Sequence, residues 1–268
     1  MTTLNHQALA GRRALVSGST AGIGFAIARA LAEQGAAVVL NGRDTGRTEQ
    51  AVRSLQQAVP GAALQGVAAD LATAAGADAV VRAAGEIDIL INNLGIYEQR
   101  AFAEQSDDDW MRLFNANVMS GVRLTRGLLP AMKARGWGRV VFISSESGVN
   151  PPGDMLHYGV TKAAQIALGR GLAETCVACG VTVNSVLPGP TLTEGAQAYL
   201  EGAAKRAGTS VAEAQAQFFR DARPTSLIRR FIAPEEVAAL VAHVCGPLSG
   251  AIHGAALRVE GGVVRNIL

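Results

Sequence analysis

Three polar residues with complementary acid–base chemistry lie near one another in the middle of the chain. Tyr158 and Lys162 are four residues apart in "HYGVTKAAQ", and Ser145 lies thirteen residues before the tyrosine in "FISSESG". On a helix, a four-residue step places two side chains on one face, about one turn apart. A nearby ammonium group stabilises a phenolate and lowers the pKa of the phenol. The pattern predicts an active site in which Tyr158 transfers a proton.

A glycine-rich turn near the start of the chain predicts a nucleotide site. In "SGSTAGIG", Gly18, Gly22 and Gly24 have the spacing G-x-x-x-G-x-G. Such glycines let the backbone turn tightly and approach a pyrophosphate at the N-terminus of the next helix. Any tight strand–helix turn could use glycine, but this is the first such turn in a chain of alternating strands and helices. That position favours a dinucleotide cofactor.

The residues that end the second predicted strand favour NADP(H). An acidic side chain there would bind the ribose hydroxyls of NAD, whereas an arginine would bind the additional phosphate of NADP. The sequence "LNGRD" places Asn41 at the strand end and Arg43 two residues later. Asp44 is expected to cap the following helix and so to point away. The alternative is NAD(H), with Arg43 as an ordinary solvated surface charge.

Apolar segments of strand length alternate with helical segments along the chain. We expect strands at 12–18, 37–42, 64–70, 87–93, 138–145, 181–189 and 255–260. We expect helices at 24–36, 45–59, 72–85, 107–135, 157–179 and 234–245, with a cap region at 106–109 before the fourth. The alternation predicts an α/β fold with a doubly wound parallel seven-stranded sheet and helices on both faces, a Rossmann fold. No Pro/Gly/Ser linker divides the chain, so we expect a single domain over residues 1–268.

The segment 190–233 is the irregular part of this pattern. It lies between the sixth strand and the last helix and contains two helical stretches, "EGAQAYLEGAAKR" and "VAEAQAQFFRDA". Ligands of doubly wound sheets bind beyond the carboxyl ends of the strands, close to such a segment. We therefore expect 190–233 to form a mobile lid over the substrate.

Composition and charge exclude several classes of protein. The net charge is +2, no run of like charges is present, and aromatic residues make up 4% of the chain, so a nucleic-acid partner is not expected. No apolar stretch reaches the length of a membrane span. The first residues lack the pattern of a secretion signal, which favours a cytoplasmic location.

The three cysteines do not predict a metal or redox site. Cys176 and Cys179 form a C-x-x-C pattern late in the predicted helix 157–179, whereas reactive pairs usually lie at a helix N-terminus. A zinc site would need two more ligands, and Cys245 is the one cysteine left. We expect these side chains to be packed in the interior, and no metal site.

Several motifs in order along the chain resemble the short-chain dehydrogenase/reductase family, with an overall similarity to 3-oxoacyl reductases. They are "SGSTAGIG", "AAD" at 68–70, "NNLG" at 92–95, "FNANVMSG", the serine of "FISSESG", "YGVTK", "VNSVLPGPT" and "EGGVV". The resemblance implies a catalytic set of Asn117, Ser145, Tyr158 and Lys162. With the glycine-rich turn and the second strand end, it implies a cofactor site of Gly18, Ser19, Thr20, Gly22, Ile23, Gly24, Asn41, Arg43, Asp70, Leu71, Asn93, Gly95, Tyr158, Lys162, Pro188, Gly189 and Thr191. Such proteins are commonly homotetramers that pair through the long helices, here 107–135 and 157–179.

The residue types in this set support carbonyl reduction. Hydride transfer from NADPH to a carbonyl carbon creates an alkoxide that needs a proton, and Tyr158 would supply it. Lys162 and the oxidised nicotinamide would lower the pKa of Tyr158, and Lys162 could also hold the nicotinamide ribose. Ser145 would orient the substrate oxygen. Asn117 would link Lys162 to a chain of proton-supplying water.

A few residues depart from the family pattern. Leu94 replaces the usual alanine between "NN" and glycine, and would either narrow the cofactor groove or fill the core. Glu146 places a carboxylate beside Ser145, either near the mouth of the site or in a solvated loop. Cys179 stands where carrier-protein reductases often have an arginine, which tells against a carrier-bound substrate.

The leading hypothesis is an NADPH-dependent carbonyl reductase acting on a small-molecule ketone or secondary alcohol, including 3-oxoacyl compounds. The alternative is a non-catalytic module on the same fold that senses a dinucleotide or binds a partner. A third hypothesis is an epimerase or dehydratase of the same family.

Overall fold

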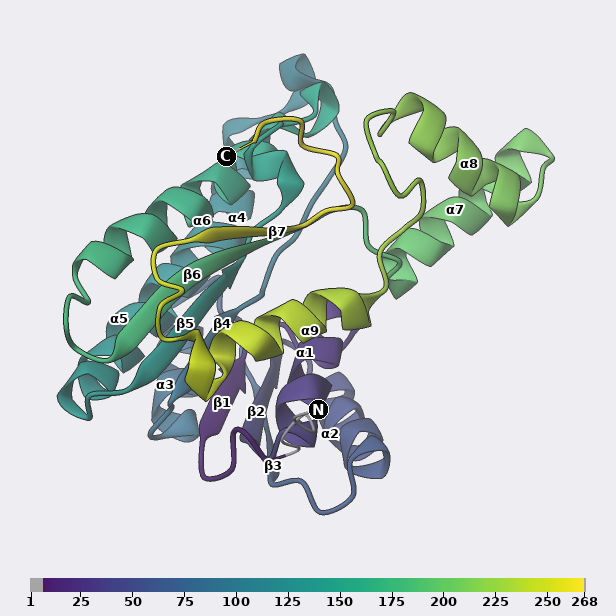
Figure 1. Cartoon of the computed structure of the whole chain (residues 1–268). Coiled ribbons are helices and arrows are strands. Elements are labelled where there is room, and N and C mark those ends of the chain that lie inside the picture. Colours follow the sequence, from purple (N-terminus) through teal and green to yellow (C-terminus); the bar gives the residue numbers. More distant parts are fainter. Residues whose placement is uncertain (1–6, 268) are drawn as a thin grey trace.

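Seven parallel strands form the central sheet of the computed structural model, which describes residues 7–267 (Figure 1). They are β1 (Arg13–Val16), β2 (Ala37–Gly42), β3 (Leu64–Ala68), β4 (Ile89–Asn92), β5 (Gly138–Ile143), β6 (Val181–Pro188) and β7 (Ala256–Val259). Their order is β3-β2-β1-β4-β5-β6-β7, and every neighbouring pair is parallel. The predicted strands are confirmed with ends shifted by up to two residues. The predicted domain also includes residues 1–6 and 268, which lie outside the described residues.

Helices cover both faces of this sheet, as the sequence predicts. They are α1 (Gly22–Glu33), α2 (Thr45–Ala58), α3 (Ala74–Ala84), α4 (Asp107–Phe114), α5 (Ser120–Ala134), α6 (Leu156–Glu174), α7 (Glu194–Ala207), α8 (Val211–Asp221) and α9 (Pro234–Cys245). Buried residues of α1, α2 and α9 pack on one face, and those of α3, α5 and α6 pack on the other. Alternate residues of β1 contribute to the two cores, with Val16 on one face and Leu15 on the other. The sheet is therefore doubly wound, and its strand order reverses between β1 and β4.

The predicted helix 107–135 is interrupted by one wider turn. The chain forms α4, then a π-helical turn over Asn115–Met119, and then α5. A capping box starts α4, because Ser106 Oγ accepts from the Asp109 N–H and the Asp109 carboxylate accepts from the Ser106 N–H. The cap prediction is confirmed. The π turn, which sequence periodicity does not reveal, holds Asn117.

The segment 190–233 contains the two helices expected from the sequence, α7 and α8. They pack together around a small core of Leu200, Phe219 and Phe231 and lie apart from the sheet in Figure 1. The two ends of the segment are joined by a backbone bridge, in which the Leu192 N–H donates to the Ile232 carbonyl over 2.9 Å. The pair of helices is thus anchored at both ends beside the carboxyl end of β6.

The cysteine pair lies beyond the end of α6 and not late within a helix, because α6 ends at Glu174. Cys176 is buried and Cys179 is partly buried, and the Cys179 thiol donates to the Cys176 carbonyl. Within residues 7–267, no three His, Cys, Asp or Glu side chains are grouped to hold a metal ion. The helices of this part of the chain are all too short or too polar to cross a bilayer.

Candidate active site

The turn between β1 and α1 requires glycine at several positions. Gly18 and Gly22 have φ values of 60° and 55°, a region that side-chain-bearing residues avoid. A Cβ on Gly24 would lie 2.4 Å from both the Gly18 carbonyl oxygen and the Asn93 side-chain nitrogen. Ala21, the residue before α1, has no side chain that could cap the helix, so the first N–H groups of α1 are available to a phosphate.

Side chains behind this turn hold its shape. Ser17 Oγ accepts from the N–H groups of Asn93 and Leu94, and the Asn93 amide donates to the carbonyls of Ser17 and Gly18. Ser19 Oγ donates to the Val16 carbonyl. Asn93 and Ser19, both expected at the cofactor, therefore act in the structure as braces of the turn.

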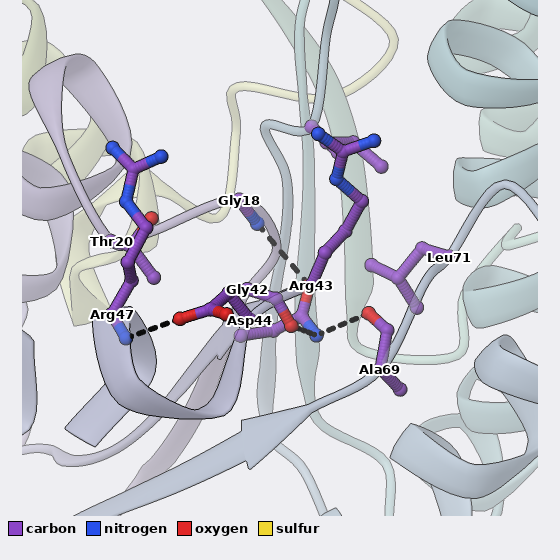
Figure 2. A pocket seen from close by; sticks show the side chains of 10 residues that line it. Gly18, Thr20, Gly42, Arg43, Asp44, Arg47, Ala69 and Leu71 are labelled. Atoms are coloured by element: carbon purple, nitrogen blue, oxygen red, sulfur yellow. Dashed lines mark hydrogen bonds between the residues drawn. The ribbon is translucent and has the colours of Figure 1, made fainter.

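A pocket of about 240 Å³ opens beside this turn, at the carboxyl ends of β1, β2 and β3 (Figure 2). Five of the expected cofactor residues line it, namely Gly18, Thr20, Asn41, Arg43 and Leu71. Leu94 also lines this pocket and packs on the α3–α5–α6 core. The Asn41 side chain is buried and donates to the Val67 and Ala69 carbonyls, which joins β2 to β3.

A second arginine, which sequence reasoning missed, lines the same pocket. In Figure 2 the side chains of Arg43, in the turn after β2, and Arg47, at the start of α2, both extend upward. Asp44 caps α2 by accepting from the Arg47 N–H over 2.7 Å, as expected. Arg47 lies in the first turn of α2, where a cation opposes the helix dipole. That unfavourable placement is the sequence signal that could have identified it.

The other expected cofactor residues surround the site without lining this pocket. Asp70 is exposed, and its carboxylate accepts from the Ala72 N–H, which shapes the turn after β3. Gly189 is required by packing, since a Cβ there would lie 2.6 Å from the Glu260 carbonyl oxygen. Thr191 donates to the Gly189 carbonyl over 2.9 Å. Three of the remaining expected residues, Gly22, Ile23 and Gly24, form the start of α1. Gly95 lies shortly after β4, and Pro188 is the last residue of β6.

The four expected catalytic residues converge from three places in the chain. Ser145 follows β5, Tyr158 and Lys162 lie in the first two turns of α6, and Asn117 lies in the π turn. Ser145 lies close enough to Tyr158 to lower the pKa of its phenol. Lys162 Nζ lies 5.6 Å from the centre of the Tyr158 ring and donates to the Ile143 carbonyl over 2.8 Å.

Gln165 is the residue that joins Lys162 to Asn117, and sequence reasoning missed it. Its side-chain oxygen accepts from Lys162 Nζ over 3.0 Å, and its nitrogen donates to the Asn117 carbonyl over 2.6 Å. The Asn117 side chain in turn donates to the Ile96 carbonyl and to Thr161 Oγ1. The spacing of three residues from Lys162 on one helix face could have indicated Gln165.

Burial dominates the acid–base properties of this group. It raises the pKa of Tyr158 to about 12, although the hydrogen bond from Ser145 lowers it. Burial also lowers the pKa of Lys162 to about 7. The direction for Tyr158 is opposite to the sequence expectation, because desolvation of the phenol is the largest contribution. The ammonium group of Lys162 is instead bound to a main-chain carbonyl and to Gln165. A raised pKa keeps the phenol protonated near neutral pH.

Glu146 lies inside the protein and not in a solvated loop. It is 3% exposed, and its carboxylate forms an ion pair with Arg223, with 2.9 Å between Oε1 and Nε. Burial raises the pKa of Glu146, while the guanidinium group opposes the shift. The negative charge of Glu146 contributes to the raised pKa of Tyr158.

Comparisons with known proteins agree with this arrangement. Residues 12–204 match the family described as short chain dehydrogenase. The uncharacterized oxidoreductase YvaG of Bacillus subtilis is 47% identical over 259 residues, which cover 97% of this chain and 98% of that protein. D-beta-hydroxybutyrate dehydrogenase of Cupriavidus necator is 32% identical, with 96% of this chain and 99% of that protein covered. L-Sorbose reductase from Gluconobacter frateurii, solved in complex with NADPH and L-sorbose, is similar in structure with a TM-score of 0.93 and 33% identity, covering 98% and 100% of the two chains.

Proposed function

The chain belongs to the short-chain dehydrogenase/reductase family of oxidoreductases, and we propose that it uses NADPH to reduce a ketone to a secondary alcohol. The observation that carries the proposal is the convergence of Ser145, Tyr158 and Lys162, in which Lys162 Nζ lies 5.6 Å from the centre of the Tyr158 ring and Ser145 is close enough to lower the pKa of that phenol. This group lies at the carboxyl edge of the same sheet as the glycine-rich turn, where doubly wound folds bind ligands. L-Sorbose reductase and D-beta-hydroxybutyrate dehydrogenase, by name, act on compounds of the ketone/alcohol type.

The residues around the glycine-rich turn fit a phosphorylated dinucleotide. The uncapped N-terminus of α1 would hold the pyrophosphate, and the pocket between Thr20 and Leu71 would take the adenosine end. Arg43 and Arg47 would bind a phosphate on the adenosine ribose. When bound, NADPH supplies the hydride that reduces the carbonyl carbon.

The chain's own residues would position the substrate and supply the proton. Ser145 would donate a hydrogen bond to the carbonyl oxygen and fix its position. Tyr158, protonated in the buried site, would give its proton to the alkoxide oxygen. Lys162, held by Gln165 and the Ile143 carbonyl, would bind the nicotinamide ribose through its ammonium group. Asn117 would fix this network through the π turn.

Removing either arginine of the pocket should weaken NADPH selectively. We expect Arg43→Ala and Arg47→Ala each to raise the Kd for NADPH by roughly tenfold or more, because charge-assisted hydrogen bonds to a phosphate are lost. The Kd for NADH should change little in both variants. Fluorescence titration of each purified variant with the two cofactors measures the difference.

Arg53→Ala is the matched control, since Arg53 lies on the same helix with an exposed side chain paired to Glu49. It should bind both cofactors as the wild type does. An equal loss of NADPH and NADH affinity in the Arg43 or Arg47 variant would refute recognition of the additional phosphate and restore NAD(H) as the cofactor.

The main competing function is a non-catalytic dinucleotide-sensing module on the same fold. We favour the enzyme because Asn117, Ser145, Tyr158 and Lys162 are all present, with Lys162 linked to Asn117 through Gln165 and Tyr158 beside both Ser145 and Lys162. Substrate-dependent oxidation of NADPH would also separate a reductase from an epimerase or a dehydratase. Three further properties stay predictions. They are pairing of the chain into a homotetramer through α4–α5 and α6, motion of the segment 190–233 as a lid, and a cytoplasmic location. A 3-oxoacyl compound stays a candidate substrate.

A further inference from the structure

A buried ion pair joins the catalytic loop to the segment 190–233. Glu146 directly follows Ser145, and Arg223 follows the end of α8, 77 residues later. Their side chains are 4% and 17% exposed. Burying two charges costs free energy that the mutual attraction often does not offset, so such a pair is weak evidence for a purely stabilising role.

The hydrogen-bonding capacity of this pair is only partly used. Glu146 Oε1 accepts from Arg223 Nε and from Ser147 Oγ, which lies 3.3 Å away. Among residues 7–267, no group donates to Glu146 Oε2, and this oxygen is not sealed from solvent. Arg223 Nη1 donates to the Ala222 carbonyl, and Nη2 has no acceptor in the described part of the chain. One acceptor and one donor of the pair are therefore open to a ligand.

The pair is coupled to the catalytic residues by both contacts and charge. The Ser147 N–H donates to Ser145 Oγ over 3.1 Å, and the Ser147 hydroxyl donates to Glu146. Glu146 and Arg223 shift the pKa of Tyr158 in opposite directions. Ser145 and Glu146 are consecutive in the chain and Ser147 contacts both, so the ion pair lies beside the place where a substrate carbonyl would contact Ser145 and Tyr158.

Tyr97 provides a second link between this site and the segment 190–233. Its ring meets the Tyr158 ring edge to face, with 6.1 Å between centres. Its hydroxyl oxygen would lie 3.5 Å from a Cβ on Gly195, in the first turn of α7. The segment 190–233 therefore approaches Tyr97, the neighbour of the catalytic tyrosine, at Gly195 and the catalytic loop at Arg223.

We propose that Glu146 and Arg223 form a polar wall of the substrate pocket that selects ketones bearing a hydroxyl group next to the carbonyl carbon. This inference rests on the proposed reductase function and narrows its substrate class. A hydroxyl group can donate to the carboxylate oxygen and accept from the guanidinium group, so it satisfies both. An alkyl or acyl chain in the same place would desolvate Glu146 Oε2 and Arg223 Nη2 without giving either a hydrogen-bond partner, which a site of this kind rejects strongly.

The test compares two ketones that differ by one hydroxyl group, 1-hydroxy-2-butanone and 2-butanone, with NADPH as the reductant. For the wild-type chain we expect kcat/KM to be at least roughly tenfold higher for the hydroxylated ketone, because a hydrogen bond to a charged group usually contributes enough free energy for a difference of that size. Glu146→Gln and Arg223→Gln should each reduce this preference by roughly tenfold, mainly through KM. The Kd for NADPH should stay at the wild-type value.

Arg220→Gln is the matched control, because Arg220 lies on α8 with an exposed side chain that pairs with Glu213. It should keep the wild-type preference. The ratio between the two ketones is measured within each variant, so a variant of lower stability still reports on selectivity.

Three results would overturn the inference and leave the proposed function standing. They are an equal or higher kcat/KM for 2-butanone, a higher one for a 3-oxobutanoyl thioester, and an unchanged ratio in both glutamine variants. A different result would refute the proposed function itself. In that case the wild-type chain would not bind NADPH, or would oxidise it with none of the three ketones.

Discussion

Replacing Tyr158 with phenylalanine should reduce kcat by roughly 10²- to 10⁴-fold, the usual contribution of a positioned general acid. The change removes the phenolic oxygen, whose pKa Ser145 lowers, and leaves the ring in place. Because Tyr158 does not line the adenosine pocket, the Kd for NADPH should change little. Steady-state kinetics with NADPH and a ketone substrate measure kcat, and a fluorescence titration measures the Kd for NADPH.

Tyr199→Phe is the control for this prediction. Tyr199 lies on α7 with an exposed side chain and makes none of the contacts described for Tyr158. This variant should keep wild-type kcat. Normal turnover in Tyr158→Phe would show that another group supplies the proton, and the assignment of Tyr158 would have to be abandoned.

Replacing Lys162 with methionine should change activity and stability in opposite directions. Activity should fall by roughly 10²-fold or more, because the ammonium group that would hold the nicotinamide ribose is lost. The folded protein should melt at a higher temperature, by about 5 °C below pH 7, because a buried charge is replaced by an apolar side chain of similar length. The loss of hydrogen bonds to the Ile143 carbonyl and Gln165 offsets part of the gain.

The stability difference should depend on pH in one direction. Burial lowers the pKa of Lys162 from 10.5 to about 7. Between these values the unfolded chain binds a proton that the folded protein has released, so the free energy of unfolding rises with pH in the wild type. Below pH 7 both states carry the charge, and the full cost of burial remains. The Tm advantage of Lys162→Met should therefore be largest below pH 7 and shrink toward pH 10.5.

Calorimetric or fluorescence melting curves at several pH values test this expectation. Lys205→Met, on the last turn of α7 and exposed to solvent, is the control and should show no such dependence. A lower Tm for Lys162→Met at every pH would mean that the hydrogen bonds of the ammonium group outweigh the cost of burying its charge.

The fold follows from the sequence because its signals are local. Runs of apolar residues bounded by glycines specify the buried strands, and their alternation with helices specifies a parallel sheet. The pattern of glycines at 18, 22 and 24 locates the turn beside the pocket. The Asp44 cap and the Ser106–Asp109 capping box are also local, since a short side chain binds an N–H group a few residues away.

The features that sequence reasoning missed depend on contacts between distant segments. The π turn at 115–119 is accompanied by hydrogen bonds from Asn117 to Ile96 and Thr161, which come from two other parts of the chain. The burial of Glu146 depends on Arg223, 77 residues away. The raised pKa of Tyr158 reflects burial, which residue spacing does not report.

The most direct test of the central claim is to follow the hydride itself. The purified chain would be incubated with NADPH deuterated at both C4 positions and with 1-hydroxy-2-butanone, 2-butanone or a 3-oxobutanoyl thioester. We predict an alcohol product that carries one deuterium on the carbinol carbon, detected by mass spectrometry, with one NADPH oxidised per alcohol formed. An alcohol without deuterium, or no oxidation of NADPH with any of the three ketones, would contradict the assignment as an NADPH-dependent carbonyl reductase.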